Sequence, residues 1–161
     1  MDTIIPHLWF ADHAEEAARF YVSLIPNSRI DSVVTMPAES PAGPAGSVQV
    51  VEFTLNGSPF LALKAGPLDP FNHAISFVIP CETQGEIDRL WDALSEGGTV
   101  ERCGWLKDRY GVSWQIVPKA LGEMMKDRDP ARGRRVAEAM LGMVKLDIAG
   151  LERAYEGRAA A

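Results

Sequence analysis

Residues 4–15 (IIPHLWFADHAE) and residues 74–86 (AISFVIPCETQGE) follow one plan, and this repetition decides the fold. Each stretch begins with a short apolar run that predicts a β-strand. Each ends in a polar residue followed three positions later by glutamate, as Asp12-x-x-Glu15 and Thr83-x-x-Glu86. This spacing is a capping box, in which the two side chains satisfy unpaired backbone N–H groups at a helix start. The sequence therefore predicts one structural unit used twice.

Strand-like runs follow each predicted helix. In the first half, a helix over 13–25 precedes apolar runs at 29–35, 48–55 and 60–63, and Asn56-Gly57 between the last two is typical of a hairpin turn. In the second half, the helix ends at Gly97-Gly98, and we expect strands over 99–106 and 113–117 with a turn near Tyr110-Gly111. The sequence thus predicts an α+β fold, with two βαβββ modules forming curved mixed sheets whose concave faces are open to a ligand.

The modules are expected at about 1–66 and 67–118 and form one domain over 1–118. Residues 119–161 change to a helical pattern, with Asp147 as the cap of a last helix. We interpret this extension as a clasp over the sheets or as a dimer element. Residues 36–47 (MPAESPAGPAGS) are dense in Pro, Gly, Ala and Ser and predict a long loop, either a mobile lid or a disordered connection.

Composition excludes several classes of function. The chain of 161 residues carries a net charge of −6, whereas nucleic-acid-binding proteins present basic patches. It contains no apolar run of about 18 residues and no recognisable secretory signal, so we expect neither a membrane span nor export. Two cysteines, Cys81 and Cys103, do not make a disulfide framework, and free thiols in the cytoplasm are expected.

Five segments resemble the PhnB-like branch of the vicinal oxygen chelate superfamily, which also holds glyoxalase I, extradiol dioxygenases and bleomycin and fosfomycin resistance proteins. They are FYVSLIP (20–26), HAISFVIP (73–80), TQGEIDRLWDALSEGG (83–98), CGWLKDRYGVSWQIVP (103–118) and AMLGMVKLDIAGLERAYEG (139–157). The parts KDRYGVSWQIVP and AMLGMVKLDIAGL are the specific signals, and the resemblance covers nearly the whole chain. It implies a glyoxalase-like fold and a homodimer.

The resemblance also implies a place for a metal. Metal-using members of the superfamily take His, Gln or Glu ligands from strands one, four, five and eight, and these groups suit a divalent ion that polarises a substrate oxygen. On this chain the matching positions are His7, Ala62, His73 at the opening of strand five, and Gln115 where a Glu usually stands. Alanine cannot ligate, and Lys64 on the same predicted face offers a cation instead. A divalent ion (Zn, Ni, Mn or Fe) held by His7, His73 and Gln115 is therefore one hypothesis, and structural histidines are the other.

The spacing of the two histidines does not decide whether they lie on the same sheet face. His7 stands five residues before Asp12, and His73 stands ten before Thr83. Strand alternation then places the imidazoles on different faces, unless a bulge or a loop corrects the parity.

Without a metal, the same residues describe a pocket with aromatic walls and a few polar anchors, as ligand sites usually have. The predicted ligand-binding residues are Trp9, Glu52, Phe53, Lys64, His73, Trp105 and Gln115. Trp114 is a further candidate for the walls, although strand parity favours a buried position between sheet and helix. Cys103 shares the strand parity of Trp105, which would let it face the pocket, and we expect it to be an ordinary thiol. Lys107 and Asp108 are expected to form a solvent-exposed pair.

Three functions remain open. The first is a small-molecule-binding protein with its ligand in the concave cleft. The second is a metal-dependent isomerase, lyase or dioxygenase acting on a vicinal-oxygen substrate, and the third is a structural dimer without chemistry. The methyltransferase name often attached to this branch is not supported, because no Gly-rich turn follows any predicted strand.

Overall fold

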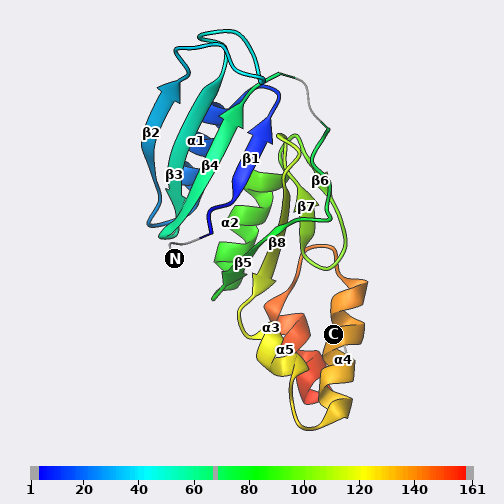
Figure 1. Cartoon of the computed structure of the whole chain (residues 1–161). Coiled ribbons are helices and arrows are strands. Elements are labelled where there is room, and N and C mark those ends of the chain that lie inside the picture. The colour runs from blue at the N-terminus through cyan, green and yellow to red at the C-terminus, as the bar shows by residue number, and fades with distance from the viewer. Residues whose placement is uncertain (1–3, 67–68, 159–161) are drawn as a thin grey trace. The chain divides into compact units, whose positions relative to one another are not determined.

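The computed structural model describes residues 4–66 and 69–158, and it confirms the predicted α+β fold (Figure 1). The chain divides into two compact units, one reaching Pro70 and the other beginning at Phe71. Each unit holds one four-stranded mixed sheet and a helix that packs on one face of it. None of the helices in the described residues is long and apolar enough to cross a membrane.

The first unit contains β1 (His7–Phe10), α1 (Ala14–Leu24), β2 (Arg29–Thr35), β3 (Gln49–Leu55) and β4 (Ser58–Lys64). Its sheet has the order β1-β4-β3-β2, with β1 parallel to β4 and the other pairs antiparallel. Asn56 and Gly57 both have positive φ (45° and 80°), which confirms the predicted hairpin turn between β3 and β4.

Strand alternation gives the first sheet two distinct faces. The face against α1 is buried and apolar, and it carries Leu8, Phe10, Val51, Phe53 and Ala62. The opposite face carries His7 and Trp9 on β1, which pair with Leu61 and Leu63 of β4. The register therefore puts both residues of β1 that the sequence nominated on one surface.

The predicted capping box at Asp12 is wrong. The N-cap of α1 is His13, which has a left-handed φ of 62° and makes no side-chain capping hydrogen bond. Asp12 instead accepts a hydrogen bond from the backbone N–H of His13 and pairs with Lys64 at 3.0 Å, while Glu15 pairs with Arg19. The left-handed residue moves the helix start one position along the chain, so the two side chains cannot close a box around it.

The 36–47 loop between β2 and β3 is closed by its own backbone. The N–H of Met36 donates to the carbonyl of Val48, and the N–H of Gly46 donates to the carbonyl of Met36, each at 2.9 Å. Ser40 and Gly43 exchange two further backbone hydrogen bonds. These bonds extend the β2–β3 pairing into the base of the loop.

The second unit contains β5 (Phe77–Cys81), α2 (Gln84–Ser95), β6 (Thr99–Val100), β7 (Trp105–Lys107) and β8 (Ser113–Pro118), followed by three helices. The sheet order β5-β8-β7-β6 repeats that of the first unit, again with the first and last strands parallel. The side chains buried between this sheet and α2 are Ile87, Leu90, Trp91, Leu94, Leu106, Trp114 and Ile116. The predicted core position of Trp114 is therefore confirmed.

The predicted capping box at Thr83 is confirmed. The backbone N–H of Glu86 donates to Thr83 Oγ1, and the backbone N–H of Thr83 donates to Glu86 Oε2, both at 3.2 Å. Thr83 has an extended backbone, which is the conformation that an N-cap residue needs.

Two strand predictions in the second unit are wrong. The single strand expected over 99–106 is a tight hairpin in which β6 folds back on β7, because Cys103 and Gly104 have left-handed φ values of 60° and 80°. β5 begins at Phe77 and not at Ala74, so His73 lies in a turn before the strand and does not open it.

The C-terminal helices are α3 (Leu121–Met125), α4 (Pro130–Gly142) and α5 (Ile148–Glu156). They lie beyond the ends of β5 and β8, not over a face of that sheet (Figure 1). Of the two interpretations of this extension, a clasp over this sheet is therefore wrong, and a dimer element stays a prediction. They enclose a small core of Leu121, Val136, Leu146 and Leu151. Asp147 caps α5 as predicted, since its carboxylate accepts the N–H of Gly150 at 2.9 Å.

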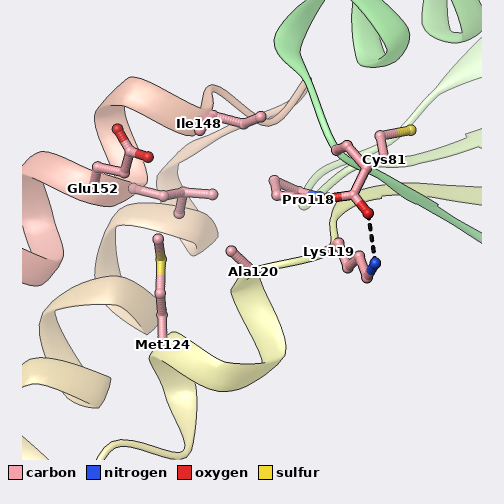
Figure 2. A pocket seen from close by; sticks show the side chains of 9 residues that line it. Cys81, Pro118, Lys119, Ala120, Met124, Ile148 and Glu152 are labelled. Atoms are coloured by element: carbon pink, nitrogen blue, oxygen red, sulfur yellow. Dashed lines mark hydrogen bonds and ion pairs between the residues drawn. The ribbon is translucent and has the colours of Figure 1, made fainter.

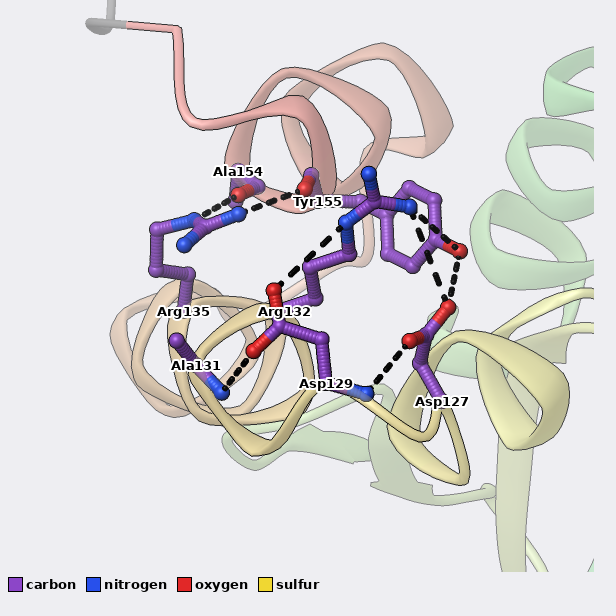
Figure 3. A network of polar contacts seen from close by, with 7 residues as sticks. All are labelled: Asp127, Asp129, Ala131, Arg132, Arg135, Ala154 and Tyr155. Carbon is purple, nitrogen blue, oxygen red and sulfur yellow. Dashed lines mark hydrogen bonds and ion pairs between the residues drawn. The ribbon is translucent and has the colours of Figure 1, made fainter.

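A polar network joins α4 to α5 (Figure 3). Arg135 donates to the carbonyl oxygens of Ala154 and Tyr155, each at 2.9 Å, at the C-terminal end of α5. The hydroxyl of Tyr155 donates to Asp127 at 2.5 Å, and this bond is the main reason that the pKa of Asp127 is lowered. The tail is thus a folded part of the second unit.

Candidate ligand-binding site

The sheet face of the second unit that is turned away from α2 carries two of the nominated residues side by side. Trp105 on β7 pairs with Gln115 on β8, which in turn pairs with Val78 on β5. Trp114 and Ile116, on either side of Gln115 in the chain, are buried. Gln115 is therefore on the face opposite to them, as strand alternation predicted.

His73 reaches Trp105 from the turn before β5. Its ring meets the indole of Trp105 edge-on, with centroids 6.4 Å apart and an interplanar angle of 80°. Its Nδ1 lies 3.5 Å from Glu101 Oε2, and the imidazole is largely exposed. The imidazole therefore contacts an aromatic wall and is paired with a carboxylate, an arrangement that orients it without burying it.

These residues line an open hollow of about 320 Å³. Its lining residues are His73, Glu101, Arg102, Cys103 and Trp105. Two of the five, His73 and Trp105, were predicted as ligand-binding residues from the sequence. Glu101 and Arg102 were missed, because their turn was expected to be strand. Gly104 within an otherwise strand-like run was the available signal, since an isolated glycine in a strand often marks a bulge or bend.

The two cysteines differ in environment. Cys103 is partly buried and lines the hollow, which it reaches from the left-handed turn and not from the strand that was expected there. Cys81 is buried at the end of β5, and burial, helped by the nearby carboxylate of Glu86, raises the pKa of its thiol to about 11. A nucleophilic thiol has to ionise, so Cys81 is a structural residue.

Gln115 is held by a neighbour. Its amide nitrogen donates to the hydroxyl of Ser76 at 2.9 Å. Ser113, two residues before it on β8, is 2% exposed, and its hydroxyl has no hydrogen-bond partner among the described residues.

Asp108 is buried, so the prediction of an exposed Lys107–Asp108 pair is wrong. Its carboxylate accepts the N–H groups of Tyr110 (2.9 Å) and Val112 (3.0 Å) and the indole Nε1–H of Trp114 (2.8 Å). These bonds fix the turn between β7 and β8 and hence the start of the strand that carries Gln115. Sequence alone did not show that the turn folds around the carboxylate.

In the first unit, His7, Trp9 and Glu52 share the sheet face turned away from α1. Trp9 donates its Nε1–H to the carbonyl of Ala65 at 2.8 Å, and Glu52 accepts a hydrogen bond from Ser32 at 2.9 Å. His7 is exposed. The role of Trp9 and Glu52 in ligand binding stays a prediction.

Phe53, Lys64 and Ala62 lie on the other face of that sheet. Phe53 is 1% exposed and Ala62 is fully buried, both facing α1, and Lys64 has the same strand parity and pairs with Asp12. Alternation along β3 and β4 therefore separates Phe53 and Lys64 from Trp9 and Glu52. Ala62 was expected at the position of a metal ligand, and the same alternation shows that it faces α1 instead.

The predicted metal ligands do not form a set within either unit. His7 belongs to the first unit, whereas His73 and Gln115 belong to the second. Across residues 4–66 and 69–158, no cluster of three or more His, Cys, Asp or Glu side chains is arranged to hold a metal ion. In the second unit alone, one imidazole paired with Glu101 and one amide bonded to Ser76 do not fit a resident divalent ion, which needs more ligands and better charge compensation.

A smaller cavity of about 90 Å³ lies between the ends of β5 and β8 and the helices α3 and α5 (Figure 2). Pro118, Ala120, Met124 and Ile148 give it an apolar lining, and the ion pair of Lys119 with Glu82 (2.5 Å) lies at one side. No residue nominated as a ligand-binding or metal-binding residue lines this cavity.

Comparisons with known proteins identify relatives of the whole sheet region. Residues 2–117 match the model of a family described as 3-demethylubiquinone-9 3-methyltransferase. The structure of a PhnB protein from Bacillus cereus, described with the same enzyme name, is 35% identical with a TM-score of 0.65. That match covers 73% of this chain and 99% of the Bacillus chain. A comparison with curated proteins gives no match.

More distant structures share the fold alone. Protein PA1353 from Pseudomonas aeruginosa is 22% identical with a TM-score of 0.58, and the match covers 74% of this chain and 98% of that one. The fosfomycin resistance protein FosX from Mesorhizobium loti is 11% identical with a TM-score of 0.55, covering 78% and 98%. A FosX structure from Listeria monocytogenes, also 11% identical, is a complex with Mn(II) and 1S,2S-dihydroxypropylphosphonic acid.

Proposed function

Because the chain belongs to the PhnB-like branch of the vicinal oxygen chelate superfamily, we propose that it is a small-molecule-binding protein whose ligand occupies the hollow beside His73 and Trp105. One observation carries the proposal. Two residues nominated by sequence, separated by 32 positions (105 − 73), line the same hollow and are in ring contact.

The chemistry of the hollow indicates the kind of ligand. Trp105 supplies a flat apolar wall, and Glu101 and the imidazole of His73 supply polar groups at its side. Aromatic walls with few polar anchors are typical of small-molecule sites. An aromatic or conjugated ligand with at least one hydrogen-bonding group fits this lining.

Metal-dependent catalysis receives less support. FosX from Listeria shows that a protein of this fold binds Mn(II). The donors of this chain do not make such a site within either unit, because His73 and Gln115 are engaged with Glu101 and Ser76. The methyltransferase description of the family is not supported either, because this sequence contains no Gly-rich turn of the kind that binds a nucleotide.

The test is tryptophan emission titrated with a library of small aromatic acids, phenols and amides, with and without Mn²⁺. We expect saturable quenching without metal that Trp105→Phe removes and Trp9→Phe keeps. Trp9 is the matched control, since it lies on a sheet face of the first unit. Saturable binding lost in Trp9→Phe but kept in Trp105→Phe would place the ligand elsewhere, and binding strictly dependent on Mn²⁺ would favour the metal-dependent alternative.

A cytoplasmic homodimer completes the proposal. The family resemblance supports the dimer, and two free cysteines fit a reducing compartment. Sedimentation equilibrium of the full chain checks the assembly, with twice the mass of one chain as the expected result.

A further inference from the structure

A short segment behind the hollow fastens the turn that forms its wall. After α4 ends at Gly142, residues 143–148, which we call the strap, pass along the β6–β7 turn. The N–H of Cys103 donates to the carbonyl of Met143 at 2.9 Å, and the N–H of Gly104 donates to the carbonyl of Val144 at 2.8 Å. On the other side, the carbonyl of Gly104 accepts the N–H of Ile116 at 2.8 Å. The turn is thus held between the strap and β8.

The strap is in turn anchored to the first turn of α2. Gln84 donates its side-chain amide to the carbonyl of Leu146 at 3.1 Å and accepts the N–H of Ile148 at 2.9 Å. Lys145 pairs with Asp88, one helical turn along, at 2.7 Å. Leu146 is fully buried in the core of the C-terminal helices. A single glutamine side chain therefore holds two backbone groups of the strap.

The turn that the strap holds has an uncommon backbone. Cys103 adopts a left-handed φ of 60°, a conformation that is sterically unfavourable for a residue with a Cβ. A Cβ on Gly104 would lie 2.6 Å from the carbonyl oxygen of Ile116 and 3.0 Å from Leu146. Strained conformations persist where neighbouring contacts over-determine them, and they are common at ligand sites.

We propose that the strap is a positioning element of the ligand site, which fixes the left-handed Cys103–Gly104 turn and thereby the wall of the hollow, with Gln84 as its main positioning residue. The ligand's place in the hollow rests on the proposed function, whereas the link from strap to wall does not. The proposal also gives a role to AMLGMVKLDIAGL (139–151), one of the two segments that carry the family resemblance and one that the ligand site does not use.

The experiment uses the full chain without ligand and compares Gln84→Ala, Gln84→Glu and the control Gln49→Ala. Gln49 is the matched control because its amide also makes a side-chain hydrogen bond, to Glu15, but in the first unit. Two readouts report the hollow: the rate at which Cys103 reacts with a maleimide, resolved by mass spectrometry, and acrylamide quenching of Trp105, taken as the difference from Trp105→Phe. A third, hydrogen exchange of the amides of Cys103 and Gly104, reports the strap.

We expect Gln84→Ala to raise both the exchange of those amides and the labelling of Cys103 about fivefold, and to increase the quenching of Trp105. Gln84→Glu keeps the acceptor for Ile148 but sets a carboxylate oxygen against the carbonyl of Leu146 and beside Asp88, so it should also raise both rates. Gln49→Ala should give no change. If Gln84→Ala does not fold, Lys145→Ala replaces it, with the same changes expected at smaller amplitude.

Two outcomes overturn the proposal. Unchanged amide exchange in a folded variant would mean that Gln84 does not hold the strap. Faster exchange with unchanged thiol labelling and Trp105 quenching would make the strap a purely structural contact. Failure of the proposed function is distinguishable, because it would appear as absent ligand quenching in the parent chain, whatever the strap variants do.

Discussion

The two units share a strand order but connect their second and third strands in different ways. In the first unit, β2 and β3 are joined by residues 36–48, which bond mainly to their own backbone. In the second unit, β6 and β7 are joined by residues 101–104, which bond to both the strap and β8. The hollow with His73 and Trp105 lies at the short connection. The strand order is the same in both units, whereas the candidate site lies where the second unit differs from the first.

The greatest difference in stability is expected between glycine substitutions in these two connections. Gly104→Ala should lower the free energy of unfolding by about 3 kcal/mol, since a left-handed backbone and a close approach to Ile116 both oppose a Cβ. Gly46→Ala, at a similar φ of 82° but with nothing within 4 Å, should cost only about 1 kcal/mol. Urea unfolding followed by circular dichroism measures both, and equal losses would contradict a clamped turn at Gly104.

The next largest difference in stability is expected between the turns that precede β8 and β4. Asp108→Ala should cost about 2–3 kcal/mol, because it leaves two backbone N–H groups and the indole of Trp114 without their acceptor. Asn56→Ala in the corresponding β3–β4 turn should cost about 1 kcal/mol, mainly for the positive φ of that residue. The measurement is thermal unfolding of both variants, and a larger loss for Asn56→Ala would reverse the comparison.

The two helix starts give a smaller difference. Thr83→Ala removes a working capping box and should cost about 1 kcal/mol. Asp12→Ala removes a side chain that does not cap its helix and should change stability less. Urea midpoints of the two variants, compared with the parent chain, check this order. Equal midpoints for the two variants would contradict this order.

The smallest effect is acid-dependent and occurs in both units. The pKa of Asp12 is lowered by the N–H of His13 and by Lys64, and that of Asp88 by Lys145 and Gln84. A lowered carboxyl pKa contributes stability above the ordinary value of about 4, and this contribution is lost as the pH falls through the folded-state pKa. NMR titration should therefore give midpoints below about 4 for both carboxyls, and a higher midpoint for Asp88 would argue against its pairing with Lys145.

The repeated strand order could be predicted because the information is local. Apolar runs, the Asn56-Gly57 turn and the box at Thr83 each specify a backbone conformation over a few residues. The box at Asp12 has the same spacing and failed, since a left-handed His13 intervenes. Spacing identifies the residue types that a cap needs but not the dihedral angles that bring them together.

The candidate site could be predicted only in part, because it depends on contacts between distant segments. His73 was found through the family pattern and Trp105 as an aromatic candidate for a pocket wall, whereas Glu101 and Arg102 join the hollow through the hairpin at Cys103–Gly104. That hairpin is held by a strap about 40 positions along the chain, which no local pattern predicts. Phe53 was nominated together with its neighbour Glu52, but adjacent residues of one strand face opposite sides of the sheet, and Phe53 is the buried one.

We propose that the second unit holds a small-molecule site beside His73 and Trp105. The most direct test is the ¹H–¹⁵N NMR spectrum of the full chain, titrated with the ligand that quenches most strongly in the tryptophan assay. We expect the saturating shifts to concentrate at His73, at residues 101–105 and at the side-chain amide of Gln115. Shifts confined to the open sheet face of the first unit, or saturating shifts that spare residues 101–105, would contradict this proposal.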